Sequence, residues 1–449
     1  MSPEWVSILA LLALFTVGTV LPINMGALGF VAAWLVGMFS LGLSDKQIIG
    51  GMSGDLVLTL VGVTYLFAIA KNNGTVDLIV HAALKLVRGR IGLIRWVMFI
   101  ITALLTAIGA ASPAACAIIG PIALGFAGRY GINPLLMGMF VVHGAQAGGF
   151  SPISIYGAIT NGVMRSSGLP VSEGLIFIVS FVVNLLIAVA LYLVLGRGIK
   201  ARSQEAQAGL QSEEADDSHI ADISLPSPGG ATGVATSTLA GSGLQTQIDP
   251  KTRSAQYVTI LMFAAVATLS LVFDKNIGFT SITGAVLLTA LYPKQQKGAV
   301  TQIAWATVLL VAGVSCFAAV LEKAGAPEYV GTWAAGFSTA LIGALLLCYV
   351  GGIVSAFASS TALLPIIIPI AIPLIATGGI NPITFAAALG VASTIVDVSP
   401  FSTNGALMVA NRPDTISEER YYKQVLGYAI LVTLVGPLLV WAAVVLPGW

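Results

Sequence analysis

Two series of long apolar runs, separated by a polar stretch, dominate this sequence and predict a chain folded in a membrane. A helix that spans the hydrocarbon core needs about 20 mostly apolar residues. Such runs lie near 4–20, 25–43, 53–70, 133–164 and 173–196, and then near 256–273, 278–292, 303–321, 383–410 and 425–447. Only 9% of the 449 residues are charged. Soluble domains carry roughly 25%, so a soluble enzyme is excluded.

Residues 197–255 separate the two series and are rich in Gln, Ser, Thr, Gly and acidic side chains. A segment of this composition buries too little apolar surface to fold alone, so we interpret it as a disordered linker. The formal net charge of +1 leaves no basic excess for binding nucleic acid. The three cysteines lie in apolar stretches without the spacing of a zinc site.

Two further apolar stretches, 92–127 and 330–378, are each interrupted by small or polar residues. The interruptions read Gly109-Ala110-Ala111-Ser112-Pro113 and Ala358-Ser359-Ser360-Thr361. A helix over 94–109 would reach only about 24 Å, less than a hydrocarbon core of about 30 Å, and we judge both limbs too short to span. Each stretch is therefore predicted to form a re-entrant helical hairpin. Two tilted spans are the alternative, and both give the same topology downstream.

The two series form an internal repeat. Ile132-Asn133-Pro134 recurs as Ile380-Asn381-Pro382, and the segments beginning at Ser112 and Ser151 recur at Ser360 and Ser399, all displaced by 248 positions. Each half then holds five spans and one hairpin. An odd number of crossings separates equivalent points, so the second half is inverted. The predicted fold is an all-α polytopic membrane protein with inverted repeats at 1–196 and 256–449 and broken helices at 133–164 and 383–410.

The distribution of basic residues predicts the orientation. With the N-terminus outside, the inner side receives 16 of the 20 Lys and Arg residues, and the outer side keeps Lys46, Arg165, Lys275 and Lys323. Cytoplasmic loops carry the excess of Lys and Arg. We therefore expect both termini outside and the linker in the cytoplasm.

Four places combine a hydroxyl side chain with a helix start inside the membrane: Ser112-Pro113, Ser151-Pro152, Ser359-Ser360-Thr361 and Ser399-Pro400. Serine is a preferred helix cap and proline a preferred first helical residue, so each helix is expected to restart there. A helix N-terminus attracts anions, and the repeat makes four of them converge. The residues expected to line the site are Ser112, Ser151, Pro152, Ser154, Ser360, Thr361, Ser399, Ser402, Thr403 and Asn404.

Asp397 is the only carboxylate placed deep inside a predicted span. An intramembrane acid indicates a functional site, here a cation ligand or a protonation site, and a hydrogen-bonded structural aspartate is the other interpretation. Free carbonyls at broken helices suit sodium. The residues assigned with Asp397 to cation coupling are Ala110, Gly148, Gly149 and Ser359. His143 is a candidate proton or substrate contact, or else a hydrogen bond to a neighbouring helix.

These motifs resemble the bacterial dicarboxylate carriers of the MatC type, which are associated with malonate uptake. The similarity is greatest at Val63–Ala70, His143–Gly157, Val354–Leu364 and Ser399–Ala406. The layout is more distantly similar to divalent anion:sodium symporters of the ion transporter superfamily. Those carry Ser-Asn-Thr at both hairpin tips, whereas the asparagine is missing from both tips here. The resemblance implies a homodimer held by the first three spans of each half, with the hairpins and broken helices moving as one elevator-like body.

The sequence thus predicts a non-enzymatic secondary transporter of the bacterial inner membrane, which takes up a small dicarboxylate coupled to sodium or protons. Malonate is the leading substrate. No cofactor is expected other than sodium as a coupling ion, and the expected partners are the substrate, the lipid bilayer and a second copy of the chain. An inorganic-ion or cation/proton exchanger that uses Asp397 is the alternative. A hydrolase using Ser151 and His143 lacks an orienting acid.

Overall fold

The computed structural model describes residues 2–21, 23–87, 91–196, 250–273, 275–335, 339–357, 360–376 and 379–447. The described part of the chain is helical, without strands. The first half contains α1 (Pro3–Val20), α2 (Met25–Leu41), α3 (Asp45–Ile49), α4 (Gly54–Asn72), α5 (Thr75–Val87), η1 (Ile91–Leu93), α6 (Ile94–Ala107), α7 (Ser112–Arg129), α8 (Pro134–Gly148), α9 (Ile155–Ser166) and α10 (Glu173–Leu195). The second contains α12 (Pro250–Leu271), α13 (Ile277–Leu291), η4 (Pro293–Gln295), η5 (Ala299–Gln302), α14 (Trp305–Lys323), α15 (Ala326–Ala335), α16 (Ala340–Phe357), α17 (Ser360–Ala376), α18 (Pro382–Thr394), α19 (Thr403–Ala410) and α20 (Glu418–Val444).

Among the described residues, five helices, α4, α7, α10, α14 and α20, are long and apolar enough to cross a membrane. Both predicted hairpins occur as helix pairs, α6 with α7 and α16 with α17. By length and composition α7 is a candidate span, although both limbs of the first hairpin were expected to be too short. That helix has 18 residues, whereas α6 has 14. At about 1.5 Å per residue, α7 reaches about 27 Å.

The predicted linker needs one correction. Its last six residues, 250–255, belong to α12, which begins at Pro250. Proline lacks the amide hydrogen that is unpaired at a helix start, so it suits the first helical position. Residues 197–249 of the predicted linker lie outside the described residues.

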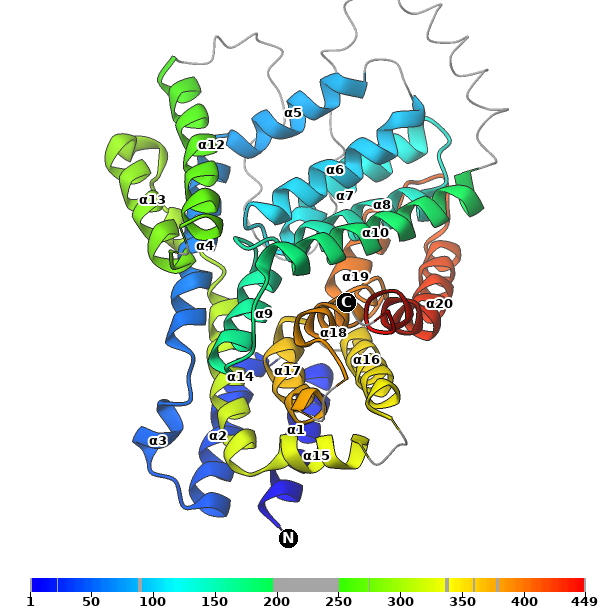
Figure 1. Ribbon diagram of the computed structural model, residues 1–449. Coiled ribbons are helices and arrows are strands. Elements are labelled where there is room, and N and C mark those ends of the chain that lie inside the picture. The colour runs from blue at the N-terminus through cyan, green and yellow to red at the C-terminus, as the bar shows by residue number, and fades with distance from the viewer. Residues whose placement is uncertain are drawn as a thin grey trace, which may run out of the picture.

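The helices form two groups, which Figure 1 shows side by side. The first group contains α1, α2 and α4 of the first half with α12, α13 and α14 of the second. The second group contains α6 to α10 with α16 to α20, so that both hairpins and both broken helices lie together.

In the first group, two close contacts between glycines are related by the inverted repeat. A Cβ added at Gly313 on α14 would lie 1.8 Å from the carbonyl oxygen of Gly26 on α2. A Cβ added at Gly62 on α4 would lie 2.7 Å from the carbonyl oxygen of Gly278 on α13. Gly26 and Gly278 hold equivalent places in the two halves, as do Gly313 and Gly62. Small residues let membrane helices approach backbone to backbone. The contact of α2 with α14 and that of α4 with α13 are therefore equivalent close helix contacts, which we call the glycine joints.

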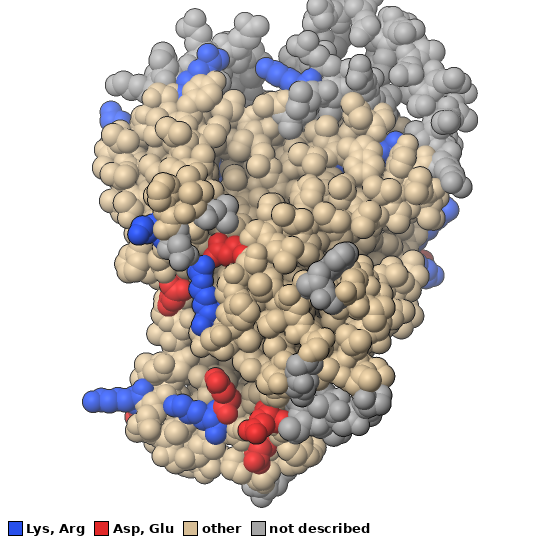
Figure 2. Space-filling view, in the orientation of Figure 1, with Lys and Arg blue, Asp and Glu red and all other residues tan. Residues whose placement is uncertain are grey.

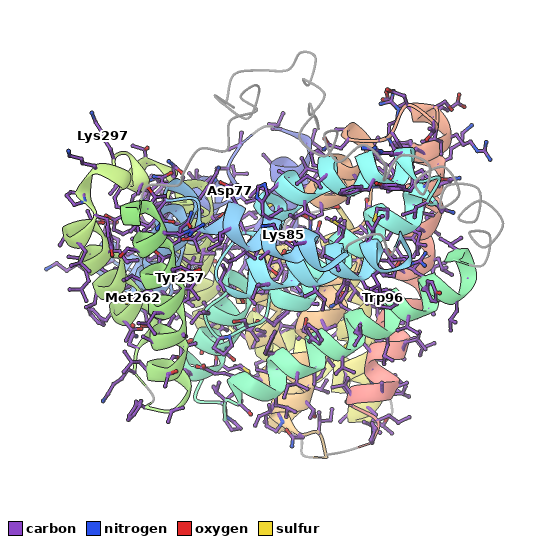
Figure 3. The ribbon with its side chains drawn as sticks, turned by 90° about the horizontal axis from the view of Figure 1, so that it is seen from above. Asp77, Lys85, Trp96, Tyr257, Met262 and Lys297 are labelled. Carbon is purple, nitrogen blue, oxygen red and sulfur yellow. The ribbon has the colours of Figure 1, made fainter. Side chains whose placement is uncertain are left out.

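The helices α5 and α15 connect the two groups. The sequence did not predict α5. It contacts α4 and α12 on one side and α6 on the other, and Figure 3 shows it with Asp77 and Lys85 in the view from above. Asp77, His81 and Lys85 are exposed at four-residue spacing, while Val76 and Val80 are buried. A short helix with one polar stripe lacks the long apolar run that marks a span.

Charged side chains are unevenly distributed over the face of the molecule that Figure 2 shows. Lys and Arg lie at the upper end and also at the middle and lower end, whereas Asp and Glu lie toward the middle and lower end. The upper end is where α12 begins. The charge count of the sequence predicts that this end faces the inner side of the membrane.

Candidate functional site

Both broken helices occur where the sequence predicts them. The first ends with α8 at Gly148 and restarts with α9 at Ile155; the second ends with α18 at Thr394 and restarts with α19 at Thr403. Ser154 caps α9 by accepting a hydrogen bond from the Gly157 amide at 3.4 Å. Its counterpart Ser402 caps α19 by accepting one from the Gly405 amide at 3.3 Å.

The caps therefore lie three residues later than predicted. Ser151 and Ser399, each followed by proline, sit in the turns before the restarted helices. The Ser154 Oγ donates to the Ser151 carbonyl at 2.6 Å, and the Ser402 Oγ donates to the Ser399 carbonyl at 2.7 Å. A hydroxyl at the end of the turn can both close the turn and accept from the helix, so it makes the better cap.

Ser112 is also not a cap. It is the first residue of α7, which follows Ala111 without a side-chain cap. Ser151 instead joins its broken helix to the first hairpin, because its Oγ donates to the Ala107 carbonyl at the end of α6 at 2.8 Å. In the second half, the Ser399 Oγ accepts from the Phe401 amide at 3.0 Å. These two serines hold equivalent places but make different bonds.

The first residues of α7, α9, α17 and α19 meet in one buried polar cluster, which we define as Ser112, Tyr156, Ser360, Asp397 and Asn404. The Asn404 Nδ2 donates to the Ser112 Oγ at 2.8 Å and to the Asp397 Oδ2 at 2.9 Å. Tyr156 lies against the side chains of Ser112 and Ser360 and close to Asp397. The expected convergence of four helix starts is thus present in the structure.

The polar cluster joins the halves crosswise. Asn404 and Tyr156 hold equivalent places in the two halves, as do Ser112 and Ser360. The restarted helix α19 packs against α7, the hairpin limb of the first half, and α9 packs against α17, the hairpin limb of the second. Each hairpin therefore meets the broken helix of the other half, and the repeat axis passes through the polar cluster.

All five residues of the polar cluster are buried, with Asp397 the most exposed at 8%. The first four residues of α7, α9, α17 and α19 contain no Lys or Arg. The partial positive charges at the polar cluster are therefore those of four helix N-termini. Asp397 is its only acidic side chain. The Asn404 Oδ1 is buried and has no hydrogen-bond partner among the described residues.

The other residues expected to line the anion site differ in how deeply they are buried. Pro152 is buried in the first turn, and Thr361 is half-buried on α17. Thr403 is exposed, unlike its neighbour Asn404, because successive helical residues point in different directions. Ser359, expected to couple cations, lies outside the described residues.

Two of the other cation-coupling candidates have contacts that explain their residue types. A Cβ added at Gly148 would lie 1.9 Å from the Ala103 carbonyl oxygen, so this glycine lets α8 press against α6. A Cβ added at Gly149 would lie 2.7 Å from the Tyr156 ring. The Gly149 carbonyl accepts a bond from Ser154. The Ala110 amide donates to the Leu105 carbonyl at 3.0 Å, which ends α6.

His143 lies apart from the contacts of the polar cluster and joins three helices. Its Nδ1 lies 2.9 Å from the Asn184 Oδ1 on α10, and its Nε2 lies 2.6 Å from the Tyr428 hydroxyl on α20. Both ring nitrogens are occupied and the side chain is fully buried. The geometry favours the interpretation that this histidine bonds neighbouring helices.

Tyr156 is the member of the polar cluster that the predicted site leaves out. The repeat places Tyr156 at the position equivalent to Asn404. Because tyrosine and asparagine differ in chemistry, the equivalence alone did not indicate a shared site. The 248-residue offset of the repeat, applied to Asn404, would have identified Tyr156.

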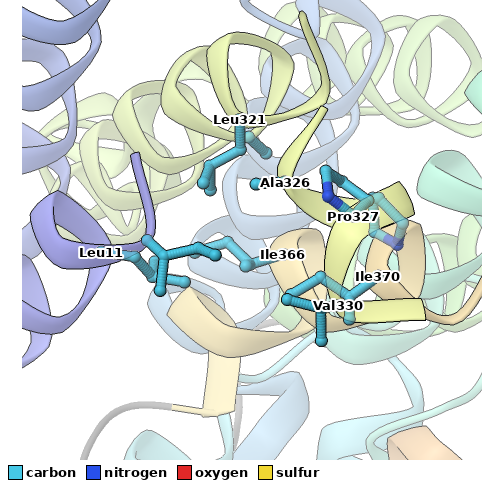
Figure 4. A pocket seen from close by; sticks show the side chains of 10 residues that line it. Leu11, Leu321, Ala326, Pro327, Val330, Ile366 and Ile370 are labelled. Atoms are coloured by element: carbon cyan, nitrogen blue, oxygen red, sulfur yellow. The ribbon is translucent and has the colours of Figure 1, made fainter. Parts of the chain in front are cut away.

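An apolar pocket lies away from the polar cluster, between α1, α14, α15 and α17 (Figure 4). Its lining side chains include Leu11, Leu321, Val330, Ile366 and Ile370. None of its lining residues is charged, so it offers nothing to an anion.

Comparison with known proteins gives matches to both halves. Residues 1–149 match the family model described as dicarboxylate carrier protein MatC N-terminus, and residues 271–448 match the model described as citrate transporter. No curated protein matches the chain. Among solved structures, the chain is similar to the YdaH transporter of Alcanivorax borkumensis, whose structure is reported to have an unusual topology. The two are 14% identical over 98% of each chain, with a TM-score of 0.55. That likeness shows a shared fold.

Proposed function

We propose that this chain, a multi-pass carrier of the ion transporter superfamily by its family resemblance, is a secondary transporter that takes up a small dicarboxylate. Malonate is the substrate we favour, and sodium or protons supply the coupling. The two family descriptions name dicarboxylate and citrate carriers. Both are small carboxylic acids, which need the same chemistry from their site.

The observation that carries the proposal is the meeting of four helix starts at the polar cluster, without a basic side chain in their first turns. Free amides and the dipole at a helix N-terminus stabilise an anion by about 0.3–1 kcal/mol each, up to about 2 kcal/mol when partly buried. Four such ends, with hydroxyls from Ser112 and Ser360, suit a carboxylate. A dianion needs further compensation, which a bound cation or proton at Asp397 would supply.

The proposal includes the wider assembly. We place the carrier in the bacterial inner membrane, with both termini outside, as a homodimer held by α1, α2, α4 and α12 to α14. The group with the hairpins and broken helices would move as one body relative to the first group. Each group packs mainly within itself; α14 also contacts α17, α4 contacts α9, and α5 and α15 connect the two groups at their ends.

Uptake of radiolabelled malonate into proteoliposomes tests the proposal, with a sodium gradient and a pH gradient imposed separately. We expect accumulation driven by one of the two gradients and competition by unlabelled malonate. Liposomes without protein are the control. Absence of malonate flux and of malonate binding under every gradient would reject the substrate.

A cation/proton exchanger on the same scaffold is the second candidate, and the buried Asp397 is the observation that favours it. Replacing Asp397→Asn separates the two. An exchanger loses all transport because its carrier group is gone, whereas a dicarboxylate carrier keeps malonate binding at high sodium. Malonate binding to the variant, measured by isothermal calorimetry, is the deciding readout.

A further inference from the structure

A buried arginine lies away from the polar cluster, at the start of the first hairpin. Arg95 is in the first turn of α6 and is only 5% exposed. Among the described residues, no carboxylate pairs with its guanidinium. Its Nε is enclosed and donates no hydrogen bond to them. A buried charge without a counter-ion is unfavourable, so this guanidinium indicates a site for an anion.

Aromatic rings hold the guanidinium on one side. The Arg95 Cζ lies 4.4 Å from the centroid of the Tyr192 ring, near the end of α10. The ring of Trp96, which Figure 3 labels, lies 5.9 Å from the Tyr192 ring between centroids. A ring contacts the face of a guanidinium and leaves the N–H groups at its edge unused. No hydrogen bond within the described residues uses the terminal nitrogens of Arg95, so this edge is open to an oxyanion.

The equivalent corner of the second half is closed without a charge. At the offset of 248 positions, Arg95 corresponds to Gly343 on α16. There the start of α16 is joined to α20 by the Trp441 Nε1, which donates to the Leu341 carbonyl at 2.9 Å. Packing at this corner therefore needs no arginine. The charge is present only at the corner that the sequence predicts on the inner side of the membrane.

We propose that Arg95, Trp96 and Tyr192, which we call the Arg95 corner, bind the phosphate headgroup of an anionic phospholipid of the inner leaflet. Helical side chains lean toward the helix N-terminus, so Arg95 leans toward the predicted inner surface. Trp and Tyr are enriched at the level of the headgroups, and the cytoplasmic leaflet carries anionic lipids. Leu193 and Val194, directly after Tyr192, are exposed and offer an apolar surface to the acyl chains.

Native mass spectrometry of the purified full-length chain in detergent tests the Arg95 corner without dicarboxylate. Dioleoylphosphatidylglycerol is compared with dioleoylphosphatidylcholine, which has the same acyl chains and no net charge. We expect the wild type to bind the phosphatidylglycerol more tightly. Arg95→Gln should weaken that binding by about tenfold or more, because a charge-assisted hydrogen bond is lost. Binding of the phosphatidylcholine should stay unchanged.

The matched control is Arg129→Gln. The Arg129 guanidinium also lies over a tyrosine ring, that of Tyr130 at 5.7 Å, but this arginine is exposed at the end of α7. Both variants lose one positive charge on the predicted inner side, so unspecific attraction to the lipid falls equally. R129Q should bind the phosphatidylglycerol as the wild type does. Where R95Q fails to fold, Arg95→Lys serves instead. R95K keeps the charge without the planar fork and should bind with intermediate affinity.

Three results would overturn the lipid site. Equal binding of both lipids by the wild type would show that the headgroup charge is not recognised. Equal weakening in R95Q and R129Q would show that only the net charge matters. Glycerol 1-phosphate is the headgroup source without acyl chains, and displacement of the phosphatidylglycerol by an equal concentration of it would assign the corner to a dissolved phosphate ester. The wild-type measurements need no variant, and none of the outcomes depends on malonate transport.

Discussion

At the scale of single residues, position in a turn decided what each serine does. Ser151 and Ser402 both lie near a proline in a broken helix, yet one bonds the neighbouring hairpin and the other caps α19. The sequence predicts that helices restart in these segments because serine, proline and glycine cluster there. It does not predict which serine is the cap, because several nearby hydroxyls can reach the same amides.

Replacing the cap Ser402→Ala should destabilise the protein by about 1 kcal/mol, since α19 loses its cap and the turn loses a donor. Thermal unfolding in detergent measures the change. Ser417→Ala is the control, because Ser417 precedes α20 without a side-chain cap bond. Equal stability of the two variants would show that Ser402 does not cap α19.

His143 gives a second test at this scale. His143→Leu leaves Asn184 and Tyr428 without their partner, and a buried polar group left unpaired costs about 1–3 kcal/mol. We expect a lower Tm with an unchanged pH profile of malonate uptake. A variant with normal stability and an altered pH profile would instead identify His143 as the proton contact.

At the scale of elements, apolar run length and the repeat predicted most of the helices. The breaks at 148–155 and 394–403 follow from glycine, serine and proline inside apolar runs. The sequence did not predict the connecting helix α5, because an amphipathic helix lacks the long apolar run that marks a span. Crosswise pairing of α7 with α19 and of α9 with α17 depends on contacts between residues far apart in the chain, which no local pattern encodes.

The glycine joints provide the test at this scale. Gly313→Ala should separate α14 from α2, because the new Cβ would overlap the Gly26 carbonyl, and overpacking costs about 1–3 kcal/mol. Gly427→Ala on α20 is the control, since a Cβ there meets nothing within 4 Å. Thermal unfolding compares the two, and a G313A variant as stable as G427A would exclude a tight joint.

At the scale of the whole molecule, the inverted repeat and the charge count together predict the orientation. The three cysteines are buried, so they should react little with a reagent that labels introduced cysteines. Ser44 precedes α3 and Thr301 lies in η5, both exposed and predicted on opposite sides of the membrane.

Ser44→Cys should react with a membrane-impermeant thiol reagent in intact cells, and Thr301→Cys only after permeabilisation. The reason is that the reagent reaches one face of the bilayer. Gel-shift labelling measures the reaction, with the unsubstituted chain as control. Labelling of T301C in intact cells with protection of S44C would reverse the proposed topology.

The partnership of Ser112 with Asn404, 292 positions apart, has a consequence for biogenesis. During synthesis the first hairpin enters the bilayer long before the segment that completes it has left the ribosome. A chain that stops after α10 lacks Ser360, Asp397 and Asn404, and so lacks most of the polar cluster. The polar cluster can therefore form only after the segment with Asn404 has been synthesised.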